Sequence, residues 1–173
     1  MANSRIRILS RLAFFVCGAV SVLMGNAHRA IFAAVGAIGD PGHVAHGKWD
    51  THSAALAVVG GIALVIALVP SSWIEKLCRV GPDDRRLPSV PIKMLGGFAA
   101  FSYFLTVGLY FAPVSWHPNQ ELVFSLCPAC VLAITVDPSL ESVLLLLAPL
   151  DAAVYGALGG VLGYMQVVLR NRS

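Results

Sequence analysis

The stretch SLCPACVLAITVDPSLESVLLLLAPLDAAVYGALGGVLGYMQVVL, residues 125–169, decides the fold. It is too apolar to be a free loop, and it is longer than the roughly 20 residues that cross a bilayer at 1.5 Å per residue. Counting back from Arg170 places the start of one crossing near Leu150. The sequence therefore predicts a long final helix over residues 138–169, of which residues 150–169 cross the membrane. A short apolar helix over residues 121–136 precedes it.

The composition of the whole chain points to the same solvent. Hydrophobic residues make up 57% and charged residues 12%, against roughly 25% charged residues in a soluble domain, and the mean hydropathy is +0.77. Helices satisfy their backbone groups internally, so an all-α fold is expected in lipid. Further apolar runs cover residues 8–27, 53–69 and 94–111. We therefore predict a single domain, an integral membrane four-helix bundle with an additional short interfacial or re-entrant helix before the last transmembrane helix.

Two alternatives to this threading remain open. The first apolar run follows Arg5, Arg7 and Arg11 and ends in small residues, so it also fits a cleaved signal peptide. A fifth crossing within residues 121–169 would move the basic C-terminus to the outer side.

The positions of the basic residues predict the orientation. If four helices alternate, ten of the twelve lysine and arginine residues fall on one side, which the positive-inside rule makes cytoplasmic. Both termini are then cytoplasmic, and all five histidines and the Cys127/Cys130 pair lie on the outer side. The sequence has no basic tract with interleaved aromatic residues, so nothing in it indicates nucleic-acid binding.

One cysteine pair has a spacing that can carry chemistry. Cys127-Pro128-Ala129-Cys130 can close a disulfide, and thiolates at such a spacing can be reactive; two small packing residues are the alternative. The pair is similar to that of four-helix membrane thiol oxidoreductases of the vitamin K epoxide reductase and disulfide-bond protein B families. Those proteins relay electrons through a second cysteine pair in an outer loop, and the outer loops here contain no other cysteine, so we do not assign the chain to either family.

Asp151 is a carboxylate at the edge of the hydrocarbon, where it costs roughly 2–3 kcal/mol. It should face protein or water and find a partner. We expect a polar cluster with Asn26 and Arg29, and the hydroxyls of Tyr103 or Tyr110 are further candidates. The cluster either stabilises the bundle as a buried ion pair or hydrogen bond, or it transfers protons or binds a ligand.

Two more groups of residues are candidates for binding or packing. His43, His46 and His52 could ligate a metal, or they could be solvated residues at helix ends. The final helix also carries a glycine ladder with G-x-x-x-G spacing, which lets helices approach closely. The ladder consists of Gly156, Gly159, Gly160 and Gly163. We expect it to meet Gly60, Gly61 or Gly97 within the bundle, or another subunit.

The sequence alone favours a non-enzymatic function, as a structural or accessory subunit of a membrane assembly. Such a subunit would bind a membrane-protein partner or a second copy through the helix face that carries the glycine ladder. The alternative is a membrane thiol-disulfide or quinone-linked oxidoreductase using Cys127 and Cys130. A third hypothesis is a small carrier or channel using Asp151 and Arg29. No cofactor is required by the sequence, although a metal or a quinone is compatible with it.

Overall fold

The computed structural model describes residues 2–39, 51–78, 86–111, 127–134 and 139–171. Every regular element in these ranges is helical. Among the described residues, four helices are long and apolar enough to cross a membrane, namely Arg7–Ile31, Thr51–Leu68, Ser89–Phe111 and Leu140–Arg170. The prediction of an all-helical chain with four such helices is confirmed.

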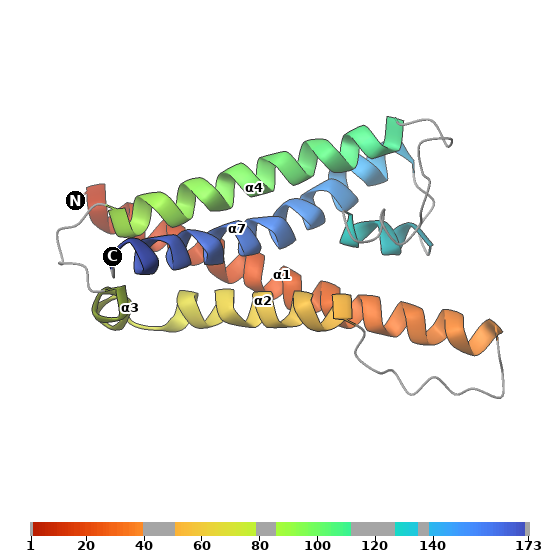
Figure 1. Ribbon diagram of the computed structural model, residues 1–173. Helices are drawn as coiled ribbons and strands as arrows, with labels where there is room; N and C mark the ends of the chain where they lie inside the picture. Colours follow the sequence, from red (N-terminus) through yellow and green to blue (C-terminus); the bar gives the residue numbers. More distant parts are fainter. Residues whose placement is uncertain (1, 40–50, 79–85, 112–126, 135–138, 172–173) are drawn as a thin grey trace.

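The long helices pack as two antiparallel pairs (Figure 1). In one pair α1 (Ala2–Gly39) lies along α2 (Thr51–Leu68), and in the other α4 (Arg86–Phe111) lies along α7 (Ala148–Arg170). Both chain termini lie at one end of the molecule, beside the short helix α3 (Ser71–Cys78). The 3₁₀ helix η2 (Pro128–Ile134) lies at the opposite end and contacts α1 and α7.

Glycines let each pair approach closely. A Cβ atom on Gly60 would lie 2.7 Å from the carbonyl oxygen of Gly18 on α1, and one on Gly159 would lie 2.6 Å from the carbonyl oxygen of Met94 on α4. Both distances are shorter than a van der Waals contact allows, so only glycine fits at these crossings.

The rest of the glycine ladder also packs within the chain. Gly163 lies against Pro91 of α4, Gly160 against the ring of Phe14 on α1, and Gly156 in ordinary contact with α1 and α4. The expectation that the ladder meets Gly60, Gly61 or Gly97 is wrong, because Gly60 packs on α1 and no described atom lies within 4 Å of a Cβ built on either of the others.

Several helix boundaries differ from those expected. Helix α1 continues to Gly39, beyond the expected crossing over residues 8–27, and the short helix α3 follows Pro70. Helix α4 begins at Arg86 rather than at residue 94, although it contains Pro91. A proline inside a helix loses one backbone hydrogen bond, and here the missing side chain of Gly163 leaves room for the Pro91 ring.

The final helix begins with α6 (Leu140–Ser142), passes through a π-helical segment, η3 (Val143–Leu147), and continues as α7. It starts two residues later than expected, because the Ser139 side chain accepts a hydrogen bond of 3.2 Å from the amide of Ser142 and caps it. Its apolar span, Leu140–Arg170, has 31 residues and exceeds the expected crossing over 150–169. Of the short helix expected over 121–136, the described part is the 3₁₀ helix η2.

Candidate functional site

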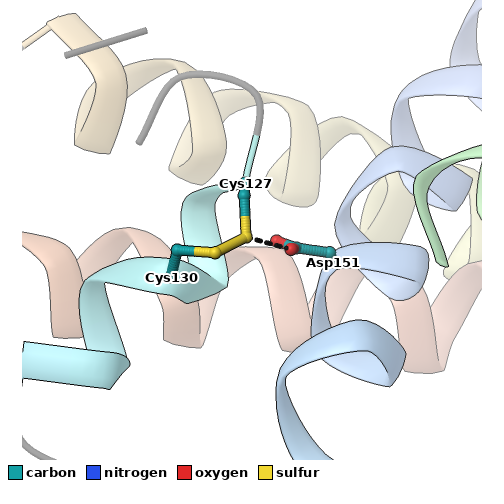
Figure 2. Close-up of side chains that lie close together, drawn as sticks. All are labelled: Cys127, Cys130 and Asp151. Atoms are coloured by element: carbon teal, nitrogen blue, oxygen red, sulfur yellow. Dashed lines mark hydrogen bonds between the residues drawn. A yellow bond between two sulfur atoms is a disulfide. The ribbon is translucent and has the colours of Figure 1, made fainter. Parts of the chain in front are cut away.

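The two cysteines of the predicted pair are joined in a disulfide, with their Cα atoms 5.3 Å apart (Figure 2). They flank the first turn of η2, where the amide of Cys130 donates a hydrogen bond of 2.9 Å to the carbonyl oxygen of Cys127. This tight turn brings both sulfur atoms to one side of the backbone. Cys127 is fully buried, whereas Cys130 is only half-buried, so the two residues differ in access.

Asp151 points from the first turns of α7 toward the disulfide (Figure 2). Its side chain has no exposed surface. The Thr106 hydroxyl on α4 lies 2.7 Å from Oδ2, and the backbone amide of Ala129 donates a hydrogen bond of 2.8 Å to Oδ1. The carboxyl group therefore links α7, α4 and the cysteine turn.

The remaining contact of Asp151 is with sulfur. Its Oδ2 atom lies 2.9 Å from Sγ of Cys127. A sulfur atom in a disulfide has no proton to donate, so a hydrogen bond at this contact requires a proton on Asp151 while the disulfide is closed. After reduction, the Cys127 thiol can donate to the carboxylate instead. The contact is thus a path for one proton between the carboxyl group and Cys127.

The Thr106 hydroxyl is shared between two oxygen atoms. Besides Asp151, it lies 3.0 Å from the carbonyl oxygen of Ser102, one turn earlier on α4. Because a hydroxyl carries one proton, Thr106 can donate to Asp151 or to Ser102, and in the second case it can accept from a protonated Asp151. Thr106 therefore accommodates both protonation states of the carboxyl group.

The described contacts of Asp151 do not include Asn26 or Arg29, with which a cluster was expected. Asn26 is exposed and donates a hydrogen bond of 2.9 Å to the carbonyl oxygen of Val22 on its own helix. Arg29 is half-buried on α1. The hydroxyl of Tyr103, one of the two tyrosines considered as partners, donates a hydrogen bond of 3.3 Å to the carbonyl oxygen of Leu144. The hydrogen bonds described for Asp151 instead go to Thr106, Ala129 and Cys127.

Of the three loop histidines, the structure describes His52, at the start of α2. His43 and His46 lie outside the described residues. His52 is exposed in the first turn of α2, and its ring centroid lies 6.5 Å from that of the buried His28 on α1. Both residues line a cavity of about 210 Å³. The cavity is also lined by Tyr155 and by Pro128, which follows Cys127 in the sequence. The cavity therefore adjoins the disulfide turn.

Sequence reasoning overlooked Thr106 and the amide of Ala129. One signal was available for Thr106: Ser102 and Thr106 are four residues apart, so they share one face of an apolar helix. Two hydroxyls on one face indicate a polar partner opposite. The Ala129 amide carried no such signal, because every residue except proline has one.

Asp151, Thr106 and the Cys127–Cys130 disulfide form one cluster, in which a buried carboxyl group contacts a disulfide. No protein-family model matches the chain, and neither a curated protein nor a solved structure matches it.

Proposed function

We propose that this protein is an integral membrane thiol-disulfide oxidoreductase in which Cys127 and Cys130 carry the electrons and Asp151 carries a proton. The observation that supports this most is the contact of 2.9 Å between Asp151 Oδ2 and Cys127 Sγ, two side chains without exposed surface. Thiol-disulfide exchange depends on the protonation of the attacking and leaving sulfur atoms. A buried carboxyl group beside one sulfur supplies that control.

The four long helices are its transmembrane segments, with η2 as the additional short helix near the outer surface. In this topology the end that holds both termini and α3 faces the cytoplasm, in keeping with the positive-inside rule. Arg7, Arg11 and Lys76 belong to that end. The disulfide then lies toward the outer side, where disulfides persist.

The difference in burial between the two cysteines determines which sulfur atom is attacked and which one leaves. A substrate thiolate attacks Sγ of the half-buried Cys130, because Cys127 is fully buried. A bond forms between the substrate sulfur and Cys130, the bond between Cys130 and Cys127 breaks, and Cys127 leaves with the electron pair. The Cys127 thiolate takes the proton of Asp151 across the 2.9 Å contact.

A second substrate thiolate completes the reaction. It attacks the substrate sulfur of the mixed disulfide and releases Cys130, which takes a proton from solvent. The substrate dithiol is oxidised to a disulfide by two electrons, and the Cys127–Cys130 pair is reduced by the same two. In the reverse direction Asp151 accepts the Cys127 proton, so that the Cys127 thiolate can attack a mixed disulfide at Cys130.

The other two hypotheses have less support. The accessory-subunit hypothesis offered the glycine ladder as its partner-binding surface, and Gly159, Gly160 and Gly163 instead pack against α4 and α1 of the same chain. The carrier hypothesis depended on a pairing of Asp151 with Arg29, whereas the described hydrogen bonds of Asp151 go elsewhere. The oxidoreductase hypothesis, in contrast, is supported by the contact of Cys127 with a carboxyl group that can supply or accept a proton.

The test is the rate at which dithiothreitol reduces the disulfide of the purified protein in detergent. Asp151→Asn keeps the size of the side chain and an acceptor for Ala129, but it cannot deliver the proton. We expect the rate to fall by about 10²-fold, the lower range for general acid-base catalysis. Glu141→Gln, an exposed acidic residue in the first turn of the same helix, should leave the rate unchanged. Equal rates for the wild type and Asp151→Asn would refute the assigned role of Asp151.

A further inference from the structure

The two sulfur atoms and the Asp151 carboxylate also form a compact set of metal-ligand atoms (Figure 2). One ligand atom from each of Cys127, Cys130 and Asp151 lies within 4.8 Å of the other two. Two ligands of one zinc ion are at most about 4.6 Å apart, twice the Zn–S bond length. The three ligand atoms are therefore close enough to converge on one ion once reduction of the disulfide lets the two sulfur atoms separate.

The carboxylate is held by its surroundings in the way that metal ligands are held. The amide of Ala129 fixes Oδ1 at 2.8 Å, and the Thr106 hydroxyl lies 2.7 Å from Oδ2. Such outer partners orient the ligands of metal sites and contribute to their affinity. Asp151 is also fully buried, and buried charges are normally paired or bound to a metal.

We propose that the reduced protein binds one zinc ion through Cys127, Cys130 and Asp151. The donor set selects this metal, because zinc accepts thiolate and carboxylate ligands together, whereas copper(I) favours soft sulfur ligands and magnesium and calcium favour oxygen. Binding displaces the two thiol protons. Three protein ligands leave a fourth position for water or a substrate atom.

Zinc and the disulfide exclude one another at this site, since both use the same two sulfur atoms. Oxidation to the disulfide releases the metal, and bound zinc protects the thiols from oxidation. The inference requires only that the disulfide can be reduced, not that it exchanges with a substrate. Its test can therefore fail without affecting the proposed oxidoreductase, and the reverse also holds.

The experiment measures zinc binding to the purified protein in detergent, by competition with a chromogenic chelator. Cys17 and Cys78 are first replaced by alanine, so that the pair contains the only thiols, and His43, His46 and His52 are replaced by alanine to remove the loop histidines as ligands. The protein is reduced with a phosphine, which is then removed. We expect one zinc ion per reduced chain and none per oxidised chain.

Variants in this background identify the ligands. The Cys127→Ser, Cys130→Ser double variant should abolish binding, and Asp151→Asn should weaken it by more than about tenfold. Thr106→Val should weaken it by about tenfold or more, the usual effect of losing an outer partner, and it provides a second test if Asp151→Asn fails to fold. Glu141→Gln should bind as the parent does. Cobalt(II) in place of zinc should give a thiolate-to-metal charge-transfer absorption that disappears on oxidation.

Three outcomes would overturn the inference. Zinc that binds equally to the reduced parent and to the double serine variant is an adventitious ion only. Unchanged affinity in both Asp151→Asn and Thr106→Val excludes the carboxylate as a ligand. Tight binding of copper(I) without binding of zinc would show a site made of sulfur alone.

Discussion

Two polar contacts join helices at opposite ends of this molecule, and they differ in their access to water. Near the termini, Arg7 of α1 and Glu75 of α3 form an ion pair of 3.3 Å, with 38% and 18% of their side chains exposed. At the other end, Asp151 contacts Thr106, Ala129 and Cys127 with no exposed surface. Exposed ion pairs contribute about 0–1 kcal/mol, whereas a buried polar group left without partners costs far more. The comparison predicts that substitutions at the two ends will differ several-fold in effect.

The largest effect on stability is expected from Asp151→Leu. The leucine side chain fills the site but leaves the buried amide of Ala129 without an acceptor. We expect the free energy of unfolding to fall by about 2–4 kcal/mol, measured by thermal or denaturant unfolding in detergent. A loss as small as that at the exposed ion pair would remove the distinction between the two ends.

A smaller effect is expected from Thr106→Val, which keeps the shape of the side chain and removes its hydroxyl. It should lower the free energy of unfolding by about 1–1.5 kcal/mol, the value of one buried hydrogen bond. Ser102→Ala is the matched control, one turn away and equally buried, because the Ser102 hydroxyl has no hydrogen-bond partner among the described residues. Equal losses for the two variants would mean that Thr106 does not support Asp151.

The smallest effect is expected from Glu75→Gln, which removes one charge of the partly exposed ion pair with Arg7. We expect a change of less than about 1 kcal/mol, decreasing further as salt is added, because salt screens exposed charges. The same salt series should leave the effect of Asp151→Leu nearly constant. A salt-independent loss at Glu75 would show that this end is as shielded as the other.

The sequence predicts the parts of this fold that depend on length and hydropathy. Each of the four helices contains an apolar window long enough to cross a bilayer, and such windows can be read from one sequence. The ends were harder to place, because α1 continues through residues 28–39 and α4 begins before Pro91. At Pro91 the close approach of Gly163 shows how packing between helices accommodates a proline inside α4.

The candidate site was predicted in its chemistry but not in its contacts. The Cys-x-x-Cys spacing indicated that a disulfide can form, and a carboxylate in an apolar run indicated a polar partner. Which side chains meet Asp151 depends on the rotation of α7 about its axis. The π-helical segment Val143–Leu147 lies just before Asp151 and changes that rotation. A helical pattern read from the sequence assumes regular turns, so it could not place Asp151 against Thr106 and the cysteine turn.

Two other cysteines must be removed before the pair can be studied alone. Cys17 and Cys78 are not in the disulfide. Burial raises the pKa of the Cys78 thiol, so it carries little thiolate at neutral pH. Alanine at both positions should leave the Cys127–Cys130 disulfide intact.

The most direct test of the account is to trap the mixed disulfide in that background. The protein is treated with a small peptide disulfide, and the covalent adduct is followed by intact mass. We predict that Cys127→Ser, which leaves the half-buried Cys130 thiol, forms the adduct rapidly, and that Cys130→Ser, which leaves the buried Cys127 thiol, forms it at least about tenfold more slowly, because access limits exchange. If neither variant forms an adduct, or if Cys127 reacts faster, the proposed exchange reaction at Cys130 is contradicted.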